Sequence, residues 1–201
     1  MARSIKLYNA AESERVRDIV AGDATAFRSL VLDYHALAYS LAYKTLNDQQ
    51  DAEEVIQDAF VKVYQALDGF RGEASLKTWI LRIVLRLSLN RRRNRSRSAW
   101  HRLGLHHKVA EEVLDTATEA TSSASQTPES LCISQETRQF LLKLIDELPD
   151  TLREVLILNS LDELSYEEIS HILHIPLGTV GSRIHAARKK LLQKLEKRDL
   201  L

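Results

Sequence analysis

Apolar residues recur at intervals of three and four over most of this chain, and few residues interrupt the pattern. Only six glycines and three prolines occur in 201 residues. Spacings of three and four place side chains on one face of an α-helix, whereas a strand needs a period of two. The sequence therefore predicts an all-α protein, and a hydrophobic content of 44% is enough for a buried core.

Three helices are expected in the N-terminal part. The first covers 24–46 and has an apolar stripe along one face. The second begins near Asp51 and has one apolar and one acidic face, and the loop DGFRGEAS follows it. Ser75 can cap the third helix, because a serine oxygen accepts hydrogen bonds from the free N–H groups of a first turn. The third helix ends in the basic run NRRRNR.

The helical pattern fails between about residues 98 and 134. Within this segment TATEATSSASQTPES is rich in Ser, Thr and Ala and contains a proline. Such a composition is typical of a flexible linker. We therefore expect two small helical domains, at 10–97 and 135–201, joined by a flexible linker at 98–134.

The C-terminal domain is expected to hold four helices. The first runs over about 135–147, and Pro149 suits the first turn of the second. Ser165 and Glu168 have the spacing of a capping box, in which each side chain bonds the backbone N–H of the other residue. This pair predicts a third helix that runs through Leu173.

The last helix follows the connection 175–178. Proline cannot continue the preceding helix, and glycine allows backbone conformations that other residues avoid. The last helix opens near Thr179. Four apolar residues then have the spacing of a buried face: Val180, Ile184, Ala187 and Leu191. Five other residues consequently face outward together: Gly181, Ser182, His185, Arg188 and Lys189.

Two helices joined by a short turn, the second of them basic, have the geometry of a helix-turn-helix that enters the major groove of DNA. Side chains near the start of such a helix reach base edges, while Lys and Arg also contact phosphates. The predicted duplex contacts are Thr179, Ser182, Arg183, His185, Arg188 and Lys189. The alternative is a solvated amphipathic helix whose basic residues favour its C-terminal end.

Charge is unevenly distributed, although Lys plus Arg and Asp plus Glu are 28 each and the net charge is zero. All charged Lys, Arg, Asp and Glu residues in 91–108 are basic, and all in 111–129 are acidic. Separate surfaces of opposite sign are typical of a chain with more than one kind of polyanion or protein partner.

The cellular compartment is also constrained by the sequence. The lone Cys132 excludes an intramolecular disulfide framework and fits a reducing compartment. No stretch approaches the roughly 18 continuous apolar residues of a membrane helix. The first residues, MARSIKLYNAAESER, lack the apolar core of a signal peptide. We expect a cytoplasmic protein without membrane insertion.

Several motifs resemble those of one family of bacterial transcription factors. ELPDTLREVLILNSLDELSYEEISHILHIPLGTVGSRIHAARKKL resembles region 4 of sigma factors of the extracytoplasmic-function group. DAEEVIQDAFVKVYQAL, FRGEASLKTWILRI and the basic end that follows resemble their region 2. Both regions occur in order and cover nearly the whole chain. The resemblance implies a sigma factor that binds core RNA polymerase and directs initiation at specific promoters.

The resemblance also implies roles for individual residues. In this family the helix with EEVIQDAF docks on the clamp helices of the polymerase, and its contacts match Glu54, Gln57 and Asp58. The third helix resembles the part that captures the non-template strand of the minus-ten element, which needs cations and hydrogen-bonding groups. Its residues are Lys77, Arg82, Arg86, Asn90, Arg91, Arg92 and Arg93. A solvated acidic face and a solvated basic helix end are the respective alternatives.

Partners follow from the same resemblance: core RNA polymerase, duplex minus-thirty-five DNA, single-stranded minus-ten DNA and an anti-sigma factor. Three positions depart from the family pattern. Arg86 replaces a frequent asparagine and Gly181 a common basic residue, so the promoter sequence stays open. His174 replaces the usual glycine of the turn, and histidine tolerates a left-handed backbone better than most residues.

The sequence leaves two other classes of function open. A self-contained regulator would bind an operator through its helix-turn-helix without polymerase, although it leaves the first domain's acidic and basic helices unexplained. A metal site or enzyme is disfavoured because no motif is present and the histidines lack a known ligand pattern. We expect no catalysis, metal or cofactor. The residue types that could bind a metal occur in two clusters: His101, His106, His107, Glu111 and Glu112, and the pair His171 and His174.

Overall fold

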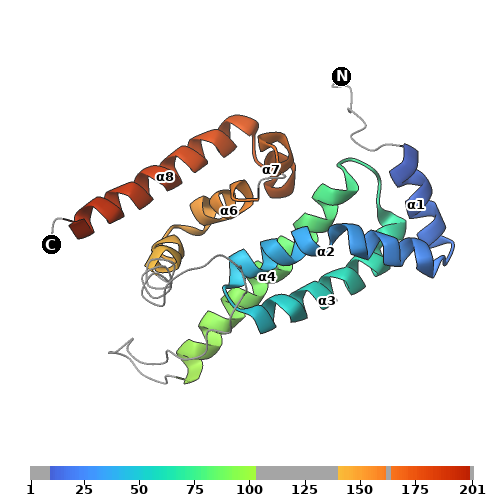
Figure 1. The fold of residues 1–201 in the computed structure, drawn as a ribbon, viewed down its shortest axis with the longest axis horizontal. Helices are drawn as coiled ribbons and strands as arrows, with labels where there is room; N and C mark the ends of the chain where they lie inside the picture. The colour runs from blue at the N-terminus through green and yellow to red at the C-terminus, as the bar shows by residue number, and fades with distance from the viewer. Residues whose placement is uncertain (1–9, 103–139, 162–163, 200–201) are drawn as a thin grey trace, which may run out of the picture.

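The computed structural model describes residues 10–102, 140–161 and 164–199 (Figure 1). Every element within these ranges is helical, which confirms the predicted all-α class. The helices form two modules, one before and one after the undescribed residues 103–139. Most of the predicted linker therefore lies outside the described residues.

The N-terminal module consists of α1 (Ala10–Val20), α2 (Ala24–Leu46), α3 (Gln49–Ala66), the 3-10 turn η1 (Leu67–Gly69) and α4 (Leu76–Arg102). α2, α3 and α4 pack against one another around side chains such as Leu30, Leu41 and Ile80, which are fully buried. α2 has the predicted bounds, whereas α1 was not predicted. Its Val16 and Ile19 are buried in the same core.

Capping residues set the helix starts in this module. Asp23 accepts hydrogen bonds from the backbone N–H groups of Thr25 and Ala26, at 2.8 and 3.2 Å. The predicted cap of α4 is confirmed, because Ser75 Oγ accepts a bond from the N–H of Thr78 at 3.1 Å. α4 continues to Arg102, past residue 98, where the linker is expected to begin. The reason is local: no glycine or proline interrupts the helix before residue 104.

The C-terminal module begins with a helical stretch at 140–146, followed by α6 (Asp150–Asn159), α7 (Tyr166–Leu173) and α8 (Leu177–Asp199). The prediction for 135–147 is confirmed only within its described part. Pro149 lies directly before α6, not in its first turn as predicted. α8 begins earlier than Thr179, since the carbonyl of Pro176 already accepts from the N–H groups of Thr179 and Val180.

The turn between α7 and α8 follows the predicted chemistry. Ser165 Oγ accepts from the N–H of Glu168 at 3.2 Å, and Glu168 Oε2 accepts from the N–H of Ser165 at 2.8 Å, which confirms the capping box. His174 ends α7 in the left-handed region, at φ 53° and ψ 45°. The histidine therefore occupies the left-handed turn position at which the family resemblance implies glycine.

The two modules pack against each other. α7 lies against α4, and α6 lies against α2 (Figure 1). The buried side chains form one continuous cluster that reaches from α1 into α8. α8 itself lies on the side of its module away from the N-terminal helices (Figure 1). This arrangement decides which predicted contact residues are accessible.

Candidate nucleic-acid and polymerase interface

α8 separates buried from exposed residues as the sequence predicts. Val180, Ile184 and Ala187 are buried as expected, whereas Leu191, the fourth residue of the expected buried face, is only partly buried. Four of the predicted duplex contacts are exposed, and two, Thr179 and Arg183, are partly exposed. The exposed four are Ser182, His185, Arg188 and Lys189. α8 thus exposes two basic residues, Arg188 and Lys189, on the face that carries Ser182 and His185.

Arg153 of α6 is a buried charged residue that was not identified by the sequence analysis. It is only 7% exposed, although it carries a full charge. Its guanidinium donates to the carbonyls of Ile145, Asp146 and Leu148 and to the carboxylate of Asp150, at 2.5–3.1 Å. It therefore caps the helical stretch at 140–146 and ties it to α6. The sequence signal was helical spacing, because Arg153 lies four residues before the apolar Ile157 in LREVLIL.

The predicted polymerase contacts form one stripe along α3. Gln57 and Asp58 are exposed and Glu54 is partly exposed. Val61 and Tyr64 continue the same stripe and are 56% and 54% exposed, which is unusual for large apolar side chains. The sequence analysis missed both, although their spacing from Glu54 and Asp58 places them on that face.

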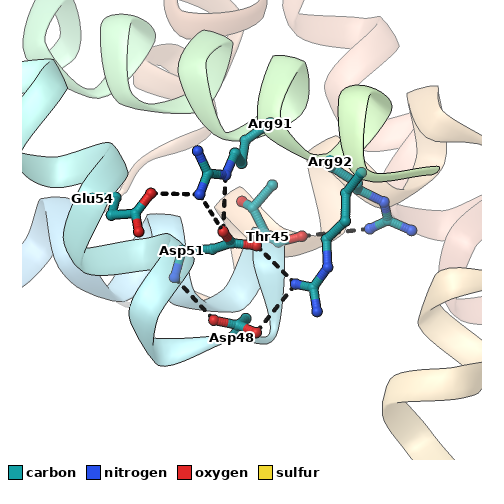
Figure 2. A network of polar contacts seen from close by, with 7 residues as sticks. Thr45, Asp48, Asp51, Glu54, Arg91 and Arg92 are labelled. Carbon is teal, nitrogen blue, oxygen red and sulfur yellow. Dashed lines mark hydrogen bonds and ion pairs between the residues drawn. The ribbon is translucent and has the colours of Figure 1, made fainter. Parts of the chain in front are cut away.

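The basic end of α4 is balanced by acids of α3. Arg91 contacts Asp51 at 2.7 Å and Glu54 at 2.5 Å, as Figure 2 shows. Arg95 contacts Asp51 at 2.8 Å and Asp48 at 3.2 Å. Hydrogen bonds to Asp51 and then Glu54 raise the pKa of Arg91. The Lys, Arg, Asp and Glu residues of 91–108 are all basic, and the acids that balance Arg91 and Arg95 come from residues 48–54.

The other predicted minus-ten residues divide into two groups. Arg86, Asn90 and Arg93 are exposed on α4. The remaining three lie at the boundary with the C-terminal module and are partly buried. These three are Lys77, Arg82 and Arg92.

Each residue of the second group contacts the C-terminal module. Lys77 Nζ lies 2.6 Å from Glu168, and Arg92 lies 3.0 Å from Asp146. Arg82 Nη2 donates to the carbonyl of His171 at 2.5 Å. Burial lowers the pKa of Arg82, and Glu73 opposes this effect. The sequence analysis did not anticipate these contacts.

No helix among the described residues is long and apolar enough to cross a membrane. In the same part of the chain, no group of three or more His, Cys, Asp and Glu residues is placed to hold a metal ion. His106, His107, Glu111 and Glu112 lie outside the described residues.

Comparison with known proteins decides the family. Residues 30–98 match Sigma-70 region 2, and residues 138–191 match Sigma-70 region 4. The chain is 35% identical over 181 residues to the ECF RNA polymerase sigma-E factor of Escherichia coli (strain K12), covering 90% of this chain and 92% of that protein. The chain belongs to the ECF sigma factors. This sigma factor is also 34% identical over 193 residues to SigW of Bacillus subtilis (strain 168), covering 93% and 97% of the two chains.

Solved structures agree on the fold. CnrH in complex with the cytosolic domain of CnrY has a TM-score of 0.63 at 21% identity and covers 94% of this sigma factor and 99% of that chain. The sigma factor RpoE in complex with the anti-sigma factor NepR from Bartonella quintana has a TM-score of 0.62 at 23% identity and covers 85% and 96%. The two-module helical fold is thus shared with sigma factors.

Proposed function

We propose that this sigma factor binds core RNA polymerase and brings α8 to a duplex minus-thirty-five element and α4 to a single-stranded minus-ten element. The observation that carries the proposal is the exposed basic face of α8, which follows a helix-turn-helix connection within a matched region 4. The other parts of the proposal assign partners to the faces of α3 and α4.

For the duplex element, Ser182 and His185 near the start of α8 are positioned to reach base edges. Arg188 can contact a guanine edge or a phosphate. Arg183, Lys189 and Thr179 contact the backbone and fix the position of the helix without reading sequence. Glycine at 181 removes one side chain from this face, so this sigma factor reads fewer bases there than a relative with a basic residue.

For the minus-ten element, Arg86, Asn90 and Arg93 form the accessible part of the α4 surface. A separated strand exposes phosphates and base edges, which these side chains can bind by charge and hydrogen bonds. This surface becomes larger when the ion pairs and hydrogen bonds of four further cations break. These cations are Lys77, Arg82, Arg91 and Arg92. Arg86 in place of asparagine changes the donors offered to a base, and with them the preferred promoter.

For core polymerase, the docking surface is the α3 stripe of Glu54, Gln57 and Asp58. We extend it to Val61 and Tyr64, because an apolar centre with a polar rim is the usual anatomy of a protein interface. Tyr64 is already held by an edge-on contact with Phe27, with ring centres 5.0 Å apart. A preordered aromatic side chain loses little entropy on binding.

The two DNA contacts act through one polypeptide. Linking two modest binding events raises the effective concentration of the second, so specificity depends on both elements at the correct spacing. Under this proposal the protein has no catalytic chemistry of its own and works in the cytoplasm beside its polymerase. An anti-sigma factor is a further expected partner, as in the solved complex of RpoE with NepR.

Run-off transcription tests the proposal. Purified core polymerase is incubated with genomic fragments, with and without the protein, and RNA start sites are mapped. New start sites preceded by two shared elements are expected. Arg188→Ala should weaken use of the upstream element and Arg86→Ala the downstream one. Absence of stimulation, together with operator binding without polymerase, would instead establish a self-contained regulator.

Polymerase docking is tested with a matched pair of variants. Val61→Lys places a charge in the centre of the apolar part of the stripe, whereas Lys62→Ala changes the exposed neighbouring residue. Val61→Lys should lower affinity for core polymerase by about tenfold or more, as substitution of a central interface residue does. Lys62→Ala should bind like the unaltered protein. Equal affinities would remove Val61 from the docking surface.

A further inference from the structure

Ser182 lies at the centre of the outward face of α8. The buried face of this helix consists of Val180, Ile184 and Ala187. At about 3.6 residues per turn, Ser182 points almost directly away from that face. Arg183 and Arg188 lie about 100° and about 120° around the helix from it, on opposite sides. Ser182 therefore faces the bases when α8 enters a groove, and the two arginines face the phosphates.

The hydroxyl of Ser182 already donates a hydrogen bond within α8. Ser182 Oγ donates to the backbone carbonyl of Thr179 at 3.1 Å. A serine hydroxyl has a single hydrogen to donate and lone pairs that accept. The side chain of Ser182 is exposed, so its lone pairs are open to a ligand in the groove. Toward DNA, Ser182 is therefore a hydrogen-bond acceptor.

Accepting from DNA keeps the internal hydrogen bond, whereas donating to DNA would break it. As an acceptor, the Ser182 hydroxyl bonds Thr179 and the base together. As a donor, it would exchange the bond to Thr179 for the bond to the base. A hydroxyl that already donates is also polarised, which makes its oxygen a stronger acceptor. The acceptor role is thus favoured by one hydrogen bond.

Only exocyclic amines donate hydrogen bonds in the major groove. Adenine offers its N6 amine and cytosine its N4 amine, whereas guanine and thymine present acceptors there. An acceptor on α8 consequently favours a base with an amine over a base with a carbonyl. The neighbouring cations cannot take this role, because Lys and Arg side chains only donate.

The surface around Ser182 permits a close approach to the bases. Serine is short, so it reaches a base only where the helix backbone lies near the floor of the groove. Gly178 and Ala186, four residues before and after Ser182, are its neighbours along the helix surface. A Cβ added at Gly178 meets no atom within 4 Å, so the protein itself leaves this place open. Short neighbours thus allow the Ser182 hydroxyl to come within hydrogen-bonding distance of a base.

We infer that Ser182 is a specificity-determining residue, which accepts a hydrogen bond from the exocyclic amine of one adenine or cytosine in the minus-thirty-five element. Because this contact requires α8 to enter the upstream duplex element, it rests on the proposed function. It adds the direction of the hydrogen bond, and with it the class of base that this sigma factor selects at one position.

Removal of single amines from the promoter tests the contact. The protein is the holoenzyme, formed from core polymerase and the full chain, and the DNA is a promoter mapped by run-off transcription. Each adenine of the upstream element is replaced in turn by 2′-deoxypurine riboside, and each cytosine by 2-pyrimidinone deoxyriboside, which lack only the amine. At one position the affinity of the holoenzyme should fall about fivefold, the effect of one net hydrogen bond.

Holoenzyme with Ser182→Ala is measured on the same promoters. Alanine is the best helix former, so this exposed substitution leaves α8 intact. At the position identified with the unaltered protein, the amine should no longer affect affinity. The double-mutant cycle separates this coupling from the weaker base pair that the modified base forms, because the base pair is the same for both proteins. Arg188→Ala is the control: it should bind every promoter more weakly and keep the fivefold response to the amine, about as large as in the unaltered protein.

Promoters with 7-deazapurines, which lack the acceptor N7, distinguish the two directions of the hydrogen bond. Coupling of Ser182→Ala to a 7-deaza position would show that Ser182 donates. Absence of coupling at every amine would show that Ser182 does not accept from a base. Either result overturns the inference while the holoenzyme still uses its upstream element. Loss of run-off transcription by the unaltered protein would instead overturn the proposed function.

Discussion

Arg91 Nε of α4 donates to Asp51 Oδ1 of α3 at 2.8 Å, and so joins the basic end of one helix to the first turn of another (Figure 2). Asp51 also accepts from Arg95 at 2.8 Å, and its side chain is only 14% exposed. One carboxylate therefore holds two cations that would otherwise repel each other. Its position in the first turn of α3 also complements the helix dipole.

Asp51→Ala should lower the free energy of unfolding by about 1.5–3 kcal/mol, the range for hydrogen bonds to charged groups. Urea unfolding followed by circular dichroism measures the change. Asp58→Ala is the control, because Asp58 lies on the same helix and is exposed without a described partner. Similar losses in the two variants would mean that the network around Asp51 contributes little to stability.

Arg153 is expected to be required for the C-terminal module. Arg153→Lys should destabilise that module by about 2–4 kcal/mol, since one ammonium cannot serve the four oxygens that the guanidinium bonds. Duplex binding should fall together with the melting temperature. Arg188→Ala provides the contrast, because Arg188 is exposed on the DNA face and its loss should weaken duplex binding alone. Unchanged melting of Arg153→Lys would contradict the structural role.

Local features were predictable because their determinants lie within a few residues. The capping box of Ser165 and Glu168 and the cap at Ser75 each join residues three apart. His174 is left-handed because α7 must end before Pro176, which cannot continue a helix. The buried face of α8 follows from its periodicity. These features also fix which residues of α8 face outward.

Long-range pairings were not predictable in the same way. Arg91 and Glu54 are 37 residues apart, and Arg82 and His171 are 89 apart. Such contacts depend on how helices and modules pack, which no local pattern encodes. α1 was missed for a related reason: its burial rests on two apolar residues, Val16 and Ile19, within a mainly polar stretch. The absence of nearby acids in sequence was thus a poor guide to the charge around Arg91.

Gly181 is a site where alanine should stabilise the protein. A Cβ added there meets no atom within 4 Å, and α8 then gains about 1 kcal/mol from replacing glycine inside a helix. Gly22→Ala is a matched substitution with the opposite expectation. Space is also open at Gly22, but its φ of +97° lies in the region that disfavours side chains. Thermal unfolding should therefore shift upward for Gly181→Ala and downward for Gly22→Ala. A lower melting temperature for both variants would show that α8 does not tolerate a side chain at position 181.

Acidification should weaken the contact between the modules through Glu168. Burial opposes ionisation of this carboxyl, but hydrogen bonds from Lys77 and Ser165 together outweigh it, so its pKa lies below the ordinary value of 4.5. The folded state then binds fewer protons than the unfolded chain. The resulting stability is fully present above 4.5 and is lost as pH falls through the lowered pKa.

Unfolding free energies from about pH 6 to about pH 3 test this linkage. Glu168→Gln should show a smaller loss of stability on acidification, because its side chain does not titrate while the capping box is retained. Lys77→Met should also flatten or reverse the dependence, since it removes the partner that favours the charged carboxylate and leaves the burial. When Glu168→Gln and Lys77→Met are combined, the second substitution should change the pH dependence little further, because both substitutions act on one ion pair. Full pH dependence in Lys77→Met would show that the ion pair does not lower the pKa of Glu168.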